Sequence, residues 1–313
     1  MSAIWGDNII KIELINFIGI NQVIDFKTDS YENSFRIGDD RYYSSMFLVD
    51  DEESPINPLE IFVLLFSSID SDLSELGLFK FFNDSFSYVY VDFIDTGIEF
   101  NYMMKLNRNG IINERLFSKE GNVRSEVKFE SLESNIGSSL LHDNMMWFSR
   151  LKYYSYITIS ADTFESDEYK TLKDFHFKNK EYWGSEYESY LLTILNLRRY
   201  GLTNIEFRKT GIRFYNNEDS HYLLLEEQDE HFINFFLLIG VVLDILSTNQ
   251  GILLMSNCDM FDDLVIRLVF NWFNKCETNS LGSQLIFVGN DFVRNKITLD
   301  RKQIILPIKK STK

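Results

Sequence analysis

The side chains with the most reactive chemistry in this sequence are few and far apart. It has two cysteines, Cys258 and Cys276, and four histidines, and none of them has the spacing of a zinc site. Cys258 follows an apolar run, which favours a small core residue over a nucleophile. The pair Asp262-Asp263 is typical of a helix N-terminus, where acidic groups are stabilised by the helix dipole. We therefore expect neither a metal site nor a resident cofactor.

The charged residues are predominantly acidic. The chain has 47 Asp and Glu against 31 Lys and Arg, a net charge of -16. Because nucleic-acid affinity comes largely from neutralising phosphates, direct DNA binding is not expected. The basic residues of the C-terminal tail form either a solvated end or a docking arm for an acidic partner. These residues are Arg301, Lys302, Lys309, Lys310 and Lys313.

Length and composition predict one globular head. The chain has 313 residues, 45% of them hydrophobic and 15% aromatic, enough to bury a large core. The N-terminus is polar by Asp7-Asn8 and lacks a signal segment. The apolar run Phe232–Leu246 contains Asn234 and Asp244 and is too short to cross a bilayer. We expect a cytoplasmic protein without a membrane span.

Two patterns predict the elements that position these residues. Alternating apolar residues near the N-terminus indicate antiparallel strands and hairpins. The expected strands are Ile9–Leu14, Gln22–Phe26, Ser87–Phe93, Gly97–Leu106 and Arg115–Phe117. Continuous apolar runs, separated in the last third by amphipathic or buried helices, indicate a parallel sheet. The expected runs are strand Ser45–Val49, helix Leu59–Phe66, helix Phe232–Leu246, strand Gly251–Met255, helix Asp262–Phe273, strand Gln284–Val288 and strand Ile304–Leu306.

The middle of the chain has a mixed signal. We expect a helical, lid-like insertion over 132–200, in which Tyr187–Arg199 is an amphipathic helix that Gly201 ends. The apolar stripe of that helix contains Tyr190, Leu191, Ile194, Leu195 and Leu197. Three short strands are expected after it, at Ile205–Phe207, Ile212–Phe214 and Tyr222–Leu225.

The order of these elements resembles a known family: the AAA-type, ABC-like ATPases of bacterial abortive-infection systems, relatives of SMC heads and OLD-family nucleases. The resemblance implies an α/β head of the P-loop NTPase type, with a mainly parallel core sheet and an antiparallel N-terminal β-region. It runs over most of the chain. The segments that carry it are Ile12–Phe17, Tyr102–Phe117 with Glu114-Arg115-Leu116, Leu191–Phe207, Leu238–Gly240 with Leu243-Asp244, Gln284–Phe287 and Arg301–Ile304.

The sequence departs from this family where the family binds phosphate. A phosphate loop has two glycines, a lysine and a serine. The resemblance puts Val49, Ser54, Pro55 and Ile56 at those positions, and the loop between contains Asp50, Asp51, Glu52 and Glu53. Two like charges near contact repel by about 1 kcal/mol even in bulk water. Pro55 also lacks the amide proton that a phosphate would accept.

The other nucleotide-site positions are changed as well. Ser256 and Asn257 follow the apolar strand where the family has an Asp-Glu pair for magnesium and water. Asn290, followed by Asp291, takes the place of the switch histidine and cannot titrate. The signature segment reads Glu227, Gln228, Asp229, Glu230 and His231, so a phosphate would again meet carboxylates.

These departures favour a catalytically inactive ATPase-like subunit that acts by protein binding. The resemblance implies a phage-defence setting and a partner such as an active ATPase homologue, a nuclease, a toxin or a second copy. One alternative is a divergent ATPase linked to nucleic-acid processing, which would need a cation from elsewhere, such as Arg41, Lys80 or a partner chain. Another is an acidic decoy that inhibits a different ATPase or DNA-binding protein. A third is an unrelated α/β protein whose segment order matches by coincidence.

Overall fold

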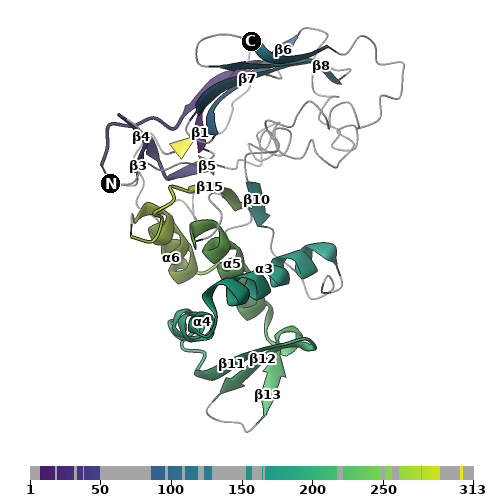
Figure 1. Ribbon diagram of the computed structural model, residues 1–313, viewed down its shortest axis with the longest axis vertical. Coiled ribbons are helices and arrows are strands. Elements are labelled where there is room, and N and C mark those ends of the chain that lie inside the picture. Colours follow the sequence, from purple (N-terminus) through teal and green to yellow (C-terminus); the bar gives the residue numbers. More distant parts are fainter. Residues whose placement is uncertain are drawn as a thin grey trace.

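The computed structural model describes residues 8–17, 20–31, 34–37, 39–49, 86–95, 98–107, 110–118, 123–128, 153–156, 164, 166–216, 221–247, 251–255, 261–275, 277–289 and 304–305. The elements are stacked in layers along the longest axis (Figure 1). An antiparallel sheet lies at one end and a parallel sheet lies next to it. Helices cover the other face of the parallel sheet, and a small antiparallel sheet lies at the far end.

The first layer is an antiparallel sheet in the order β2-β1-β6-β7-β8-β9. In β6, Val89, Val91 and Phe93 are buried, whereas the residues between them are partly exposed. This period of two fixes which face of the sheet packs inward. The strands are β1 Asn8–Phe17, β2 Ile20–Asp25, β6 Ser87–Asp95, β7 Ile98–Asn107, β8 Gly110–Ser118 and β9 Val123–Lys128.

The second layer is a parallel sheet in the order β10-β14-β15-β5-β16. All residues of β14 are buried, as expected for a strand covered on both faces. The predicted α/β class, with a parallel core sheet and an antiparallel N-terminal β-region, is confirmed. The strands are β5 Ser45–Val49, β10 Tyr153–Tyr156, β14 Ile252–Met255, β15 Gln284–Gly289 and β16 Ile304–Ile305.

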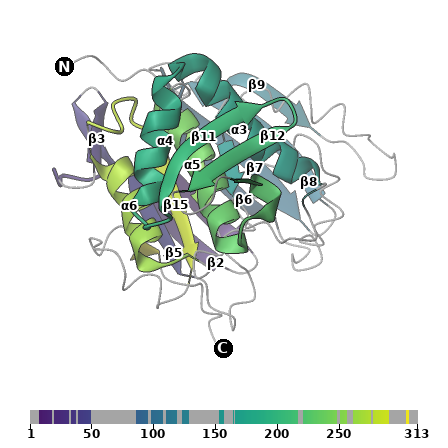
Figure 2. The same cartoon turned by 90° about the horizontal axis from the view of Figure 1, so that it is seen from below.

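Four helices are described, and α5 (Glu230–Ser247) lies at their centre (Figure 2). Its residues from Phe232 to Leu246 are all buried. Helix α3 (Asp167–Trp183) packs along it, while α4 (Glu186–Asn196) contacts α3, and α6 (Asp263–Asn274) contacts both α5 and the parallel sheet. The helix α5 has the length and composition of a membrane span, but 83% of it is buried in the protein. That burial is the property of a core helix.

A polar contact joins α3 to α5. Nε2 of His176 lies 2.7 Å from the backbone oxygen of Phe236, and its Nδ1 lies 2.7 Å from the hydroxyl oxygen of Tyr187. Because a carbonyl oxygen only accepts, Nε2 donates to Phe236, and Nδ1 accepts the proton of Tyr187. The ring also stacks on the Phe236 ring, with centroids 3.8 Å apart. The imidazole is therefore a neutral structural group.

Two smaller sheets complete the described part. The order β11-β12-β13, with β11 Leu202–Arg208, β12 Gly211–Asn216 and β13 Tyr222–Leu224, confirms the three predicted strands. A hairpin of β3 Ser34–Ile37 and β4 Asp40–Tyr43 was not expected, because the segment around it is polar. Phe35 and Tyr42 are nevertheless buried with Ile10 and Ile94 in a cluster of their own.

The middle of the chain differs from the expectation of a helical insertion. Within 132–200, Tyr153–Tyr156 is a strand paired in parallel with β14, so this part belongs to the core sheet. In α4 the buried residues include Leu191, Ile194 and Leu195. Tyr190 and Leu197 are 39% and 53% exposed, so they do not belong to the buried stripe. The predicted helix Leu59–Phe66 lies outside the described residues.

Candidate functional site

Three of the predicted nucleotide-site segments begin at one edge of the parallel sheet. Strand β5 ends at Val49, which is paired with Gly289 at the end of β15. Met255 ends β14 and is paired with Phe287 of β15. The carboxyl ends of these strands therefore meet, as they do at ligand sites of open α/β sheets. The residues that follow, Asp50–Ile56, Ser256–Asn257 and Asn290–Asp291, lie outside the part of the chain that the structure describes.

The fourth segment, predicted to be the signature region, is described in full. A short 3-10 helix, η5 (Leu225–Glu227), leads into it. Gln228 is partly exposed in a bend. Oδ1 of Asp229 accepts a hydrogen bond from the backbone N–H of Phe232 at 2.9 Å. Asp229 therefore caps α5, and Glu230 is the first residue of this helix.

A cavity of about 480 Å³ opens at this end of α5. Phe261 and Asp262, which follow β14 and precede α6, contribute to its wall, so the cavity lies on the side where β14 ends. The structure thus places part of the signature segment and the start of α6 in one site. The lining residues are Arg198, Tyr200, Asp229, Glu230, His231, Asn234, Phe261 and Asp262.

The cation of this cavity comes from the turn after α4. Arg199 and Gly201 have φ angles of 62° and 65°, and the side-chain amide of Asn196 makes two hydrogen bonds with the backbone of Leu202. This tight turn brings Arg198 into the cavity, where its guanidinium pairs with the carboxylate of Asp262.

The guanidinium of Arg198 also lies near aromatic rings. It is 5.5 Å from the ring centroid of Tyr200 and 5.4 Å from that of Phe235, within the range of cation–π attraction. Burial raises the pKa of the Tyr200 hydroxyl, and the nearby Arg198 opposes this increase. The cation is therefore already paired and stacked within the chain.

Two helix N-termini face this cavity, and each is closed by a carboxylate of the chain itself. Oδ1 of Asp262 accepts a hydrogen bond from the N–H of Val265 at 3.0 Å, as Asp229 does from Phe232. A helix N-terminus attracts anions through its free amides and its dipole. Here one amide of each helix already donates to a carboxylate, and Glu230 adds a third carboxylate to the wall. The cavity is suited to a cationic group rather than to a phosphate.

The neighbouring carboxylate of Glu226 is also satisfied within the chain. Its Oε1 accepts hydrogen bonds from the Tyr169 hydroxyl at 2.6 Å and from the Lys173 ammonium at 3.1 Å. Burial would raise the pKa of Glu226, but these donors lower it below its ordinary value. Glu226 is a structural anion that ties α3 to η5.

Sequence reasoning missed Arg198, Tyr200 and Phe261, and it assigned Asp262 only to a helix start. No local pattern distinguishes Arg198 from other basic residues at helix ends. The cation considered for a divergent ATPase, Arg41, lies on the β3–β4 hairpin with its guanidinium 3.9 Å from the Tyr31 ring centroid. Lys80 lies outside the described residues. Among the residues that can be placed, no group of three or more His, Cys, Asp and Glu side chains could hold a metal.

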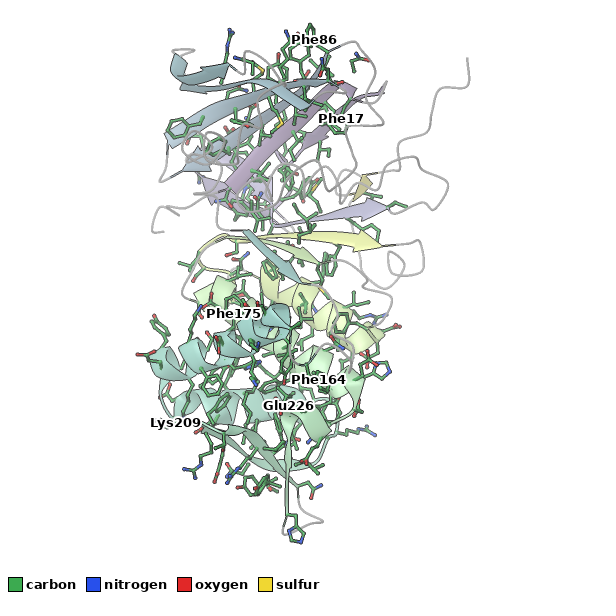
Figure 3. All side chains as sticks on the ribbon, turned by 90° about the vertical axis from the view of Figure 1, so that its right-hand side faces the viewer. Phe17, Phe86, Phe164, Phe175, Lys209 and Glu226 are labelled. Carbon is green, nitrogen blue, oxygen red and sulfur yellow. The ribbon has the colours of Figure 1, made fainter. Side chains whose placement is uncertain are left out.

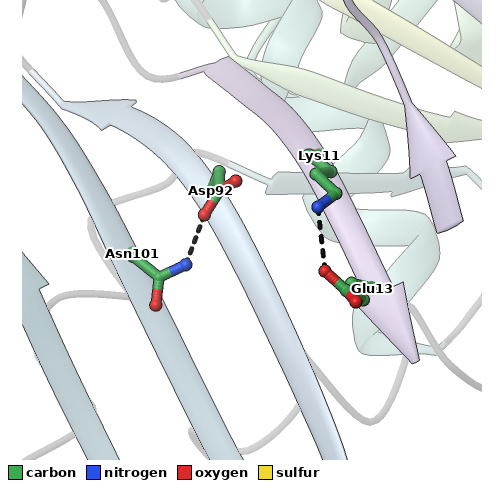
Figure 4. A network of polar contacts seen from close by, with 4 residues as sticks. All are labelled: Lys11, Glu13, Asp92 and Asn101. Atoms are coloured by element: carbon green, nitrogen blue, oxygen red, sulfur yellow. Dashed lines mark hydrogen bonds and ion pairs between the residues drawn. The ribbon is translucent and has the colours of Figure 1, made fainter. Parts of the chain in front are cut away.

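A second polar cluster lies on the antiparallel sheet (Figure 4). Lys11 pairs with Glu13 at 2.8 Å, and the amide of Asn101 donates to Asp92. The hydrogen bond that the Lys11 ammonium donates to Glu13 raises the pKa of Lys11. Lys11 and Glu13 lie two residues apart on β1, whereas Asp92 and Asn101 face each other on β6 and β7, as in a cross-strand pair. Figure 3 shows this sheet at the end of the molecule opposite Glu226 and Lys209.

No protein-family model matches the sequence, and no curated protein matches it. Solved structures do match, and heads of SMC proteins are among them. An SMC head bound to the C-terminal winged-helix domain of ScpA has a TM-score of 0.56 and 12% identity, covering 95% of this chain and 96% of that one. The SMC head of Thermotoga maritima has a TM-score of 0.49 and 12% identity, covering 93% of each chain. The first of these carries the conclusion that this chain has the α/β fold of an ABC-ATPase-like head.

Proposed function

We propose that this chain is a catalytically inactive ATPase-like head that works by binding a protein partner in a bacterial phage-defence complex of the abortive-infection type. The observation that carries the proposal is the capping of α5 by Asp229. By the resemblance to ABC-like ATPases, this segment stands where a partner's nucleotide would contact the head. A carboxylate bound to an amide at the start of α5 disfavours a γ-phosphate there and leaves an acidic surface.

The remaining predicted positions agree with this proposal. The residues that would follow Val49, Met255 and Gly289 contain four consecutive carboxylates, a proline and neutral side chains, and no lysine from 50 to 56. The strands that lead to them are intact and paired in parallel. A head that keeps the parallel strands but lacks the side chains that bind phosphate fits a role in assembling a complex rather than in hydrolysing ATP.

A basic protein surface is the partner chemistry that fits. The chain has a net charge of -16, and the cavity at the start of α5 is lined by three carboxylates and one paired guanidinium. Complementary charge accelerates association and selects partners. A solved SMC head with this fold binds the winged-helix domain of ScpA, so the fold is compatible with protein docking.

Isothermal titration of the purified chain with ATP and Mg²⁺ tests the loss of nucleotide binding. We expect no binding heat, and a head with intact phosphate-loop residues, titrated in parallel, serves as the positive control. Micromolar affinity in this chain would overturn the proposal and favour the divergent ATPase.

Affinity purification from the native host tests the partner. A protein encoded beside this chain that co-purifies with it supports an assembly subunit, whereas a foreign target supports the acidic decoy. Glu230→Lys should weaken the capture of the partner, because it reverses a charge at the cavity. Glu181→Lys makes the same charge change on an exposed residue of α3 and serves as the control. If both variants captured equally less of the partner, the net charge of the chain, and not the cavity, would determine partner binding.

A further inference from the structure

A groove of about 190 Å³ lies at the other end of α5, where α3, α5 and α6 end. It is lined by aromatic and aliphatic side chains with one carboxylate at the rim. Trp183 and Tyr190 stack with their rings nearly parallel, 2° apart in plane and 6.1 Å between centroids. The lining residues are Trp183, Tyr190, Leu243, Leu246, Ser247, Trp272, Glu277 and Thr278.

The electrostatics of this groove favour a cation. Helix C-termini carry a partial negative charge, and neither α5 nor α6 has a basic residue in its last turn. The last turn of α3 has Lys180, but its ammonium is paired with Glu188 at 2.6 Å. Lys275, which follows α6, is exposed and does not line the groove. Glu277 is therefore the charged group of the lining.

Two further features indicate which kind of molecule would carry this cation. Trp183, Tyr190 and Trp272 line the groove, and guanidinium and ammonium groups bind to the faces of such aromatic rings. The indole N–H of Trp183 is buried and has no hydrogen-bond acceptor in the described part of the chain. A peptide segment carries both a basic side chain and a carbonyl oxygen that could accept this proton.

We propose that this groove binds an arginine side chain presented by a basic segment of a partner protein, with the guanidinium between the aromatic rings and Glu277. Arginine fits better than lysine, because its planar guanidinium stacks on aromatic faces and is more weakly hydrated. This groove lies at the C-terminal end of α5, whereas the cavity lined by Asp229 lies at its N-terminal end. The proposal rests on the proposed protein-binding function and specifies where and how one contact is made.

The indole N–H signals of the isotope-labelled full chain test this site by NMR. The chain has four tryptophans, Trp5, Trp147, Trp183 and Trp272, and the variants Trp183→Phe and Trp272→Phe assign the two that line the groove. The probe is the short peptide acetyl-Gly-Arg-Gly-amide. Its counterpart with citrulline in place of arginine has nearly the same shape but no charge.

We expect the arginine peptide to shift the signals of Trp183 and Trp272 with saturation in the millimolar range, and the citrulline peptide to leave them unchanged. Glu277→Gln and Tyr190→Leu, both at exposed positions, should each weaken this binding several-fold. Glu181→Gln changes the same charge on α3 outside the lining and should have no effect. Equal shifts with citrulline, or no saturable shift with arginine, would overturn the proposal. The peptide titration contains no ATP. A negative result therefore rejects only the arginine site, and the loss of nucleotide binding is tested separately by the calorimetric titration with ATP and Mg²⁺.

Discussion

The side-chain amide of Gln284 and the backbone of Ile9 form two hydrogen bonds that join the two large sheets. The Ile9 N–H donates to Oε1 of Gln284 at 2.8 Å, and Nε2 of Gln284 donates to the Ile9 oxygen at 2.9 Å. Gln284 is 0% exposed. The Gln284 amide thus makes the two hydrogen bonds that the backbone of a neighbouring strand would make with the start of β1. It links β15 of the parallel sheet to the antiparallel sheet.

Replacing this amide should destabilise the whole head. Gln284→Leu leaves the N–H and the carbonyl of Ile9 buried without partners, and each unsatisfied group costs about 1–3 kcal/mol. We expect the free energy of unfolding in urea to fall by about 2 kcal/mol or more. Gln228→Leu makes the same change at a partly exposed bend and should alter stability much less. A small effect at position 284 would mean that the sheets are held together by apolar packing.

The buried His176 should make stability depend on pH. Burial lowers its pKa from 6.5 to about 3, although the hydrogen bond to Phe236 opposes this shift. Below about pH 6.5 the unfolded chain therefore binds a proton that the folded chain does not bind. This contribution to stability is complete above about pH 6.5 and is lost as the pH falls, by up to about 1.4 kcal/mol per pH unit.

Urea unfolding between about pH 7 and pH 5 measures this dependence. His176→Gln should reduce the slope, because glutamine does not titrate. His221→Gln, which removes an exposed histidine, should leave the slope unchanged. The same slope in His176→Gln as in the original chain would show that other groups cause the acid sensitivity.

The close approach of α3 to α5 requires glycine at position 240. A Cβ built on Gly240 would lie 2.7 Å from Cδ2 and Nε2 of His176. Alanine in a helix interior gains about 1 kcal/mol over glycine, but overpacking costs about 1–3 kcal/mol. Gly240→Ala should therefore destabilise the protein. In thermal or urea unfolding, it should cost less in a His176→Ala background, because the clashing ring is gone. Strict additivity of the two changes would contradict this steric account.

The two roles of Asp262 can be separated by substitution. Asp262→Ala removes both the cap of α6 and the pair with Arg198, and we expect a loss of about 1–2 kcal/mol. Asp262→Ser keeps an oxygen that can cap the helix and removes the pair, which for partly exposed ions is worth about 0–1 kcal/mol. Chemical denaturation of both variants measures the difference. Equal destabilisation by serine and alanine would assign the effect to the pair with Arg198.

Local pattern predicted much of the fold. The alternation in Ile9–Leu14 and the continuous apolar run Gly251–Met255 each correspond to a strand of the expected kind. The β3–β4 hairpin and β10 were missed, because Phe35 and Tyr42 lie in a polar segment and Tyr153–Tyr156 is too short to be recognised. Tyr190 was assigned to the buried stripe by its spacing, and its exposure depends on what packs against α4.

The sequence by itself determined many of the described strands and helices and the residue types at the predicted nucleotide-site positions, because periodicity, capping and residue type act over a few neighbouring residues. It already contained the carboxylates from Asp50 to Glu53 and Asp229. The tertiary structure decided which distant side chains meet. Gln284 bonds to Ile9 across 275 residues, Arg198 reaches Asp262, and Trp183 shares a groove with Trp272. Such contacts depend on how the elements pack, and no local pattern encodes them.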